Sequence, residues 1–264
     1  MKKRYVWLAA LAAVALVPRS VCAQAQPGPQ GGGQAGSPQT AKASAPIDLT
    51  GYWVSIVSED WRFRMVTPTK GDYWGVPMNA AARKLAESWD PKADEAAGNQ
   101  CKSYGAPAFM RLAAHFRFTW ENDQTLKLES DAGTQIRFLR FQTAATPGAR
   151  SWQGNSVAQW ERQGGRGGGG GGGAVQPVTG GWLKVVTTNL RAGYLRKNGV
   201  PYSENAVLTE YFDLAPQPSG SPLLVVTSIV EDPTFLTQPF IISSQFKKRT
   251  DATGWDATPC SATW

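Results

Sequence analysis

Apolar and polar residues alternate along most of this chain from residue 48 onward, the pattern of β-strands with one buried face. The alternation is clearest between residues 115 and 142, where Phe116, Phe118 and Trp120 are separated by polar neighbours. Two short polar stretches, END and DAG, divide this segment into three strands. The pattern predicts an antiparallel meander.

Further strands are predicted on both sides of this meander. Several, such as LLVVTSIV at 223–230, are apolar on both faces, which indicates that both faces are covered. The number of predicted strands makes the fold class mainly β, an antiparallel meander. We expect the meander to form a barrel or half-barrel, because closing the sheet protects the edges of its strands. The additional strands are expected at 52–58, 61–66, 151–161, 182–189, 206–213, 222–230 and 240–248.

One short amphipathic helix interrupts the strand pattern. Asn79 is a suitable N-cap, and Pro91 ends the periodic segment that follows it. The apolar residues between them recur at helical spacing, namely Ala82, Leu85, Ala86 and Trp89. Residues 90–108 are expected to be irregular.

The first 23 residues resemble a signal peptide. Three basic residues precede the apolar stretch Val6–Val17, and small or compact residues favour cleavage after Ala23. A membrane-spanning helix needs roughly 20 apolar residues, so we expect no integral membrane segment after cleavage. Lipid attachment at Cys22 is the alternative, disfavoured by Val21 before it. The expected location is therefore the periplasm or the exterior of the cell.

Composition divides the rest of the chain into two parts. Residues 24–46 are rich in Gly, Pro, Gln and Ala without apolar periodicity, which predicts a disordered tether. Residues 47–264 are long enough for a single β-barrel-like domain. The glycine-rich stretch at 164–181 lies between two predicted strands and is interpreted as a loop insertion.

Charge and histidine content limit the classes of partner. The chain has 27 Lys and Arg residues and 20 Asp and Glu residues, and four basic residues lie within the signal peptide. The mature protein therefore carries 23 against 20, a net charge of +3, and we expect a monomer that does not bind nucleic acid. His115 is the only histidine and shares the charged face of its strand with Arg117. We expect no metal site and no cofactor.

Two cysteines, Cys101 and Cys260, remain after signal cleavage. An even, minimal number of cysteines in an exported protein predicts one disulfide between them. The alternative is two separate buried thiols.

The stretch TGYW resembles the Gly-x-Trp motif on the first strand of lipocalins, with Gly51 and Trp53 at the matching positions. TEYF at 209–212 is similar to the Thr-Asp-Tyr motif of that family. The cations at 247–249 follow the last strand, where the family packs an arginine on its tryptophan. The resemblance implies a lipocalin-like barrel or half-barrel.

A second resemblance covers residues 48–260. The stretches DLTGYWVSIVSEDW at 48–61, 183–212 and 224–240 look like a group of uncharacterised exported bacterial proteins. The resemblance implies an exported single-domain protein and no particular activity.

Candidate ligand-binding residues fall into two groups. The segment 187–203 crowds aromatic and cationic side chains between two strands, a composition that favours an anionic head group, although an ordinary solvated loop is the alternative. Aromatic residues in the strands are candidates for lining a lumen or forming a platform for a sugar ring. The predicted ligand-binding residues are Trp53, Trp61, Trp120, Arg191, Tyr194, Arg196, Tyr202 and Tyr211.

Three functions remain open at this stage. The first is an exported binding protein for a small apolar or amphiphilic molecule, which an apolar cavity in the barrel would favour. The second is a carboxylate-assisted isomerase or hydrolase using Glu59–Asp60, Glu210 or Glu231–Asp232, with no catalytic residue assigned. The third is an envelope interaction protein with a packed lumen.

Overall fold

The computed structural model describes residues 39–142, 148–162, 180–218 and 220–263, all within one compact unit spanning 38–264. The predicted signal peptide, residues 24–38 of the predicted tether and residues 164–179 of the glycine-rich insertion lie outside the described residues. The last part of the predicted tether, residues 40–46, contacts the barrel: Trp160 Nε1 donates a hydrogen bond to the Ala41 carbonyl at 2.8 Å.

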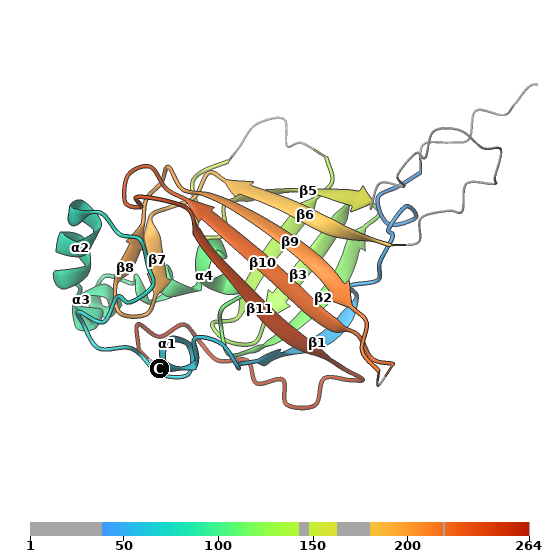
Figure 1. The fold of residues 1–264 in the computed structure, drawn as a ribbon, viewed down its shortest axis with the longest axis horizontal. Helices are drawn as coiled ribbons and strands as arrows, with labels where there is room; N and C mark the ends of the chain where they lie inside the picture. The colour runs from blue at the N-terminus through green and yellow to red at the C-terminus, as the bar shows by residue number, and fades with distance from the viewer. Residues whose placement is uncertain (1–38, 143–147, 163–179, 219, 264) are drawn as a thin grey trace, which may run out of the picture. The chain divides into compact units, whose positions relative to one another are not determined.

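Nine strands form a closed barrel (Figure 1), which confirms the predicted mainly β, lipocalin-like architecture in its closed form. Around the barrel the order is β1-β11-β10-β9-β6-β5-β4-β3-β2. The strand bounds are β1 (Gly51–Ile56), β2 (His115–Asn122), β3 (Thr125–Ser130), β4 (Gln135–Arg140), β5 (Asn155–Arg162), β6 (Gly181–Thr188), β9 (Val207–Ala215), β10 (Leu223–Glu231) and β11 (Phe240–Arg249).

The connections depart from a simple meander at two places. Strands β4 and β5 pair in parallel, Leu139 opposite Ser156, because an odd number of strands cannot alternate in direction around a closed ring. Strand β6 pairs with β9 instead of its successor in the chain. The intervening strands β7 (Gly193–Arg196) and β8 (Val200–Tyr202) form a separate hairpin.

The predicted helix is α2 (Ala80–Glu87), and Asn79 Oδ1 caps it by accepting a hydrogen bond from the Ala82 amide at 2.9 Å. The strand predicted at 61–66 is wrong, because 61–64 form the short helix α1 (Trp61–Arg64). Asp60 precedes this helix in the left-handed conformation, with φ 53°, and so turns the chain away from the strand direction.

Residues 90–108 also differ from the irregular segment that was expected. They contain α3 (Pro91–Ala96), the 3₁₀-helix η1 (Gln100–Tyr104) and α4 (Ala106–Phe109). Pro91 comes after the end of α2, as predicted, and it is also the first residue of α3. Asp90 caps this new helix. Helices α2 and α3 and the β7–β8 hairpin gather at one end of the barrel (Figure 1).

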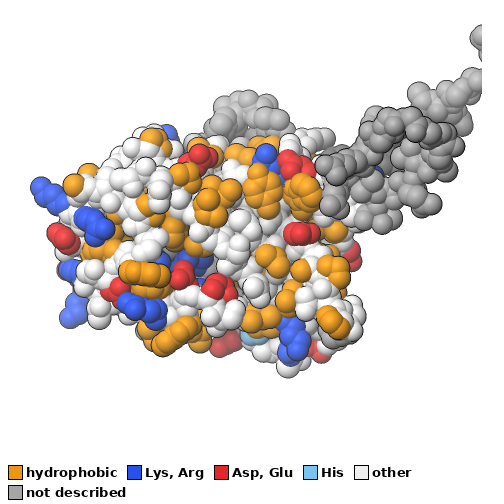
Figure 2. All heavy atoms as spheres, viewed as in Figure 1, with side chains coloured by type: hydrophobic (Ala, Val, Ile, Leu, Met, Phe, Trp, Pro, Cys, Tyr) orange, Lys and Arg blue, Asp and Glu red, His pale blue; other side chains and the backbone are white. Residues whose placement is uncertain are grey.

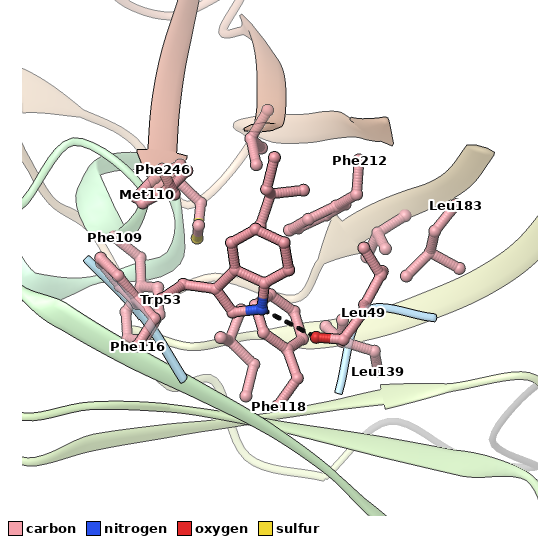
Figure 3. Packing of buried hydrophobic residues seen from close by; sticks show 14 of the residues in the cluster. Leu49, Trp53, Phe109, Met110, Phe116, Phe118, Leu139, Leu183, Phe212 and Phe246 are labelled. Carbon is pink, nitrogen blue, oxygen red and sulfur yellow. Dashed lines mark hydrogen bonds between the residues drawn. The ribbon is translucent and has the colours of Figure 1, made fainter. Parts of the chain in front are cut away.

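The lumen of the barrel is filled by apolar side chains (Figure 3). Trp53 is fully buried at its centre and donates a hydrogen bond from Nε1 to the Leu49 carbonyl at 2.9 Å. Lys248 lies opposite Trp53 in the β1–β11 register, and its Nζ is 4.8 Å from the Trp53 ring centroid. A cation from the 247–249 group therefore packs on the first-strand tryptophan, as the lipocalin resemblance implies.

Side chains also close the two ends of the lumen. At one end Phe109 of α4 packs edge-on against Phe116, with ring centroids 5.4 Å apart. At the other end Phe141 lies between Trp120 and Trp160, with centroid distances of 5.7 and 5.2 Å. The barrel interior is therefore the hydrophobic core of the domain.

The predicted disulfide is confirmed. Cys101 in η1 is bonded to Cys260 in the C-terminal tail, with an S–S distance of 2.05 Å. The tail also bridges to the β3–β4 turn, where the Thr258 amide donates to the Asp131 carbonyl at 3.0 Å. The bond therefore ties the C-terminal tail to the 3₁₀-helix η1.

Candidate functional site

A cleft with a volume of about 300 Å³ lies outside the lumen, between α2 and the β7–β8 hairpin. We call it the hairpin cleft. Its walls combine apolar side chains from several parts of the chain with a few polar groups. The lining residues are Leu85, Lys102, Ala192, Gly193, Tyr194, Pro201, Tyr202, Ser203, Glu204 and Phe235.

Glycines allow the hairpin to pack closely beneath this cleft. Gly199 has φ 82° in the turn, and a Cβ there would lie 2.3 Å from Cβ of Trp89. A Cβ on Gly193 would lie 2.6 Å from the Tyr202 hydroxyl. Buried Trp89, the last apolar residue of the helical pattern, thus fixes the turn, and Tyr202 extends under the first strand of the hairpin.

A polar network borders the cleft. Lys102 Nζ pairs with Asp94 Oδ1 at 2.6 Å, and the Tyr194 hydroxyl donates to Asp94 Oδ2 at 2.8 Å. Burial, together with the charge of Asp94, raises the pKa of Tyr194, and burial raises the pKa of Tyr202. Both phenols therefore remain protonated at neutral pH, and the Tyr194 hydrogen is donated to Asp94.

Tyr202 lines the cleft, and its hydroxyl is buried beneath the hairpin next to Gly105 and Gly193. It has no hydrogen-bond partner among the described residues. A buried hydroxyl without a partner costs free energy.

Lys197, in the turn of the same hairpin, is buried, and its Nζ lies 2.7 Å from the Tyr104 hydroxyl. Burial lowers the pKa of Lys197 from 10.5 to about 7, because the ammonium form loses hydration. The charge of the hairpin turn therefore changes near neutral pH.

This shift gives a pH-dependent stability. Between pH 7 and 10.5 the unfolded chain binds more protons at this lysine than the folded protein does, so stability rises with pH through that window. The free energy of unfolding is expected to increase by about 2 kcal/mol from pH 7 to pH 9. Urea unfolding measured at several pH values checks this rise. The Lys197→Met variant should lack it, and an equal rise in that variant would contradict the assignment.

The other predicted ligand-binding residues lie elsewhere. Only Tyr194 and Tyr202 of the eight line the hairpin cleft. Trp53 and Trp120 belong to the packed core, and Trp61 is 63% exposed on α1. Arg191 is exposed and stacks on Trp152, and Arg196 is buried beside Asp60. Tyr211 of β9 lies next to Lys184 of β6.

The predicted carboxylates are each held by a partner or exposed to solvent. Glu210 is paired with Arg137 inside the lumen. Asp232 accepts hydrogen bonds from the Ser203 amide and hydroxyl at 2.6 and 2.7 Å, and Glu231 is exposed. Glu210 and Asp232 are therefore held by structural interactions. None of Glu210, Glu231 and Asp232 lines the hairpin cleft.

His115 is partly buried, and its Nδ1 lies 2.8 Å from Asp131 Oδ2. Within the described ranges no group of three or more His, Cys, Asp and Glu residues is arranged to hold a metal ion. Across the same residues no helix is long and apolar enough to cross a membrane.

Sequence reasoning missed the cleft residues that come from distant segments, chiefly Leu85, Lys102 and Phe235. Leu85 was interpreted as part of the buried face of α2, yet it is 45% exposed. An apolar helix residue left at the surface is the signal that marks this cleft.

Apolar side chains are interspersed with both signs of charge on the face of the molecule drawn in Figure 2. That face therefore has no large patch of one charge that would mark a binding surface. The candidate site is accordingly taken from the hairpin cleft. No protein-family model, curated protein or solved structure matches this chain.

Proposed function

We propose that this chain is an exported binding protein for a small amphiphilic molecule, held in the hairpin cleft. The observation that carries the proposal is the combination, in one cleft, of an apolar wall and the ammonium group of Lys102 at its border. A volume of about 300 Å³ suits a ligand at the small end of the usual range for binding pockets.

The chemistry of the cleft favours an amphiphile over a purely apolar molecule. Leu85, Pro201 and Phe235 provide the apolar surface against which the body of the ligand packs. The ammonium group of Lys102, which pairs with Asp94 and has three N–H donors, provides a donor for a polar or anionic head group.

The barrel interior is packed, as the envelope interaction protein considered from the sequence would require, so the proposed binding site is the hairpin cleft outside the lumen. Trp53, Phe116, Phe118, Phe212 and Phe246 are each 0% exposed. Close packing of this kind gives the lumen the density of a protein core, and a ligand there would have to displace core side chains.

Export is supported by two independent features. The first 23 residues have the basic, apolar and small-residue regions of a signal peptide, with cleavage expected after Ala23. The Cys101–Cys260 disulfide suits an oxidising compartment.

The cleft can be tested with the neutral fluorescent probe N-phenyl-1-naphthylamine. We expect saturable binding to the wild-type protein with enhanced fluorescence. The Leu85→Glu variant should bind roughly tenfold more weakly, because the substitution removes apolar contact area and places a carboxylate in the cleft.

Ile136→Glu is the matched control, because Ile136 on β4 is 44% exposed against 45% for Leu85. Its probe affinity should equal that of the wild type. Equal weakening in both variants, or wild-type binding that does not saturate, would contradict a site in the hairpin cleft.

A further inference from the structure

Three buried arginines surround one pair of carboxylates next to α1. The side chains of Arg64, Arg111 and Arg196 are 1%, 6% and 1% exposed, whereas those of Glu59 and Asp60 are 37% and 27% exposed. A pocket of about 210 Å³ opens beside them, which we call the arginine pocket. It is lined by Glu59, Asp60, Arg64, Arg111, Ile242, Ser243 and Ser244.

Hydrogen bonds fix the two arginines that line this pocket. Arg64 donates from Nε to the Arg111 carbonyl at 2.8 Å and from Nη1 to Glu59. Arg111 donates from Nη1 to Asp60 Oδ2 at 3.0 Å. The guanidinium groups are therefore held in place before any ligand arrives.

Arg196 is the third arginine of the cluster and lies next to Asp60 without lining the pocket. Its Nη1 donates to the Trp74 carbonyl at 2.7 Å, its Nη2 lies 3.8 Å from Asp60 Oδ2, and its guanidinium stacks 3.9 Å from the Phe63 ring centroid. The apolar contact and the ion pair keep this cation buried.

Donor groups remain unused in this cluster. Arg64 Nη2 and Arg111 Nη2 are buried and have no hydrogen-bond partner among the described residues, and Arg196 Nε is in the same state. Guanidinium donors without acceptors cost free energy when buried, so the cluster is complete only with an additional acceptor.

The charge of the cluster fixes the sign of that acceptor. Three arginines against Glu59 and Asp60 leave a net charge of +1. The neighbouring pair of Arg62 and Asp72 adds no net charge. Burial lowers the pKa of Arg64 and Arg111, and burial and the charge of Arg111 lower the pKa of Arg196 to about 10, so all three are cations at neutral pH.

We propose that the arginine pocket binds a small monocarboxylate. The unused Nη2 groups of Arg64 and Arg111 can donate to the two oxygens of a planar carboxylate, and the net charge of +1 balances one negative charge. A phosphate dianion would leave an uncompensated negative charge between Glu59 and Asp60. The volume of about 210 Å³ accommodates a small carboxylate, with Ile242 as the apolar part of the wall.

The side-chain Nε–H signals of Arg64 and Arg111 in ¹⁵N NMR spectra report directly on this site. We expect both signals to move saturably on titration with sodium propionate at constant ionic strength. Sodium chloride at the same concentrations should leave them in place. Equal movement with chloride, tighter binding of inorganic phosphate, or no saturable movement with propionate would each overturn the proposal.

Two variants separate a binding role from a structural one. Glu59→Gln raises the net charge of the pocket to +2 and should tighten propionate binding roughly fivefold. Arg64→Lys keeps the charge but removes Nη2, and it should weaken binding about tenfold. Glu59→Gln tests the proposal by itself if Arg64→Lys does not fold, since Glu59 is partly exposed.

The matched control is Glu161→Gln, which removes a carboxylate from the pair with Lys184, where each side chain is 28% exposed. It should leave propionate affinity unchanged. If Glu59→Gln has no larger effect than Glu161→Gln, the arginine pocket is not the propionate site.

Discussion

Replacing Arg137 with methionine is expected to lower the free energy of unfolding by about 3–5 kcal/mol, because Glu210 would remain in the lumen as an uncompensated charge. Both side chains are 0% exposed. Arg137 donates from Nη1 and Nη2 to the two Glu210 oxygens at 3.0 and 2.6 Å, and from Nη2 to Thr187 Oγ1 at 3.2 Å. Urea unfolding followed by tryptophan fluorescence measures the loss.

The double variant Arg137→Met/Glu210→Leu should recover most of that stability, because replacing both ions with apolar groups removes the cost of burying charge. Lys184→Met is the control for an ordinary ion pair, since Lys184 and Glu161 are each 28% exposed. It should cost less than about 1 kcal/mol. A loss in Arg137→Met no larger than in Lys184→Met would contradict the account of the lumen pair.

Removing the disulfide with Cys101→Ala/Cys260→Ala is expected to cost about 3–5 kcal/mol, because the bond closes a loop across a sequence separation of 159 residues. Apart from the bond, the tail is anchored by a few hydrogen bonds, such as that from the Ser261 amide to the Tyr104 hydroxyl at 3.3 Å. Loss of the bond should therefore loosen residues 255–263 first.

Hydrogen exchange and urea unfolding together test this expectation. Amides of the tail should exchange faster in the double alanine variant, whereas β2 and β3 should keep their protection. A reducing agent should reproduce the effect in the wild type and add nothing in the variant. Two free thiols in the oxidised, denatured wild type would refute the bond itself.

Period-two alternation located most of the barrel strands within a few residues, because each strand buries one face. It failed where the buried face carries ions. In β4 the apolar residue Ile136 is 44% exposed, and Arg137 is buried in its place. The strand phase there depends on Glu210 of β9, which lies 73 residues further along the chain. Local periodicity contains no information about such a partner.

The candidate sites were predictable only in part for the same reason. The crowding of tyrosines and cations at 187–203 marked the hairpin that forms the cleft, and the structure shows it paired as β7 and β8. Leu85, Lys102 and Phe235 reach the cleft from three other segments through tertiary packing. Arg64 and Arg111 are separated by 47 residues and meet only because α1 turns back against the chain before β2.

The pairing of β1 with β11 has a kinetic consequence. Tyr52 faces Arg249, so the ring of strands joins two ends of the domain that are nearly 200 residues apart. Until the last strand is available, β1 has neighbours on one side only and presents unpaired backbone groups. Contacts of such long range make folding slow, because the entropy of closing the loop is lost before the pairing forms. A chain that is still being synthesised must therefore remain incompletely folded until residues 240–249 have been added.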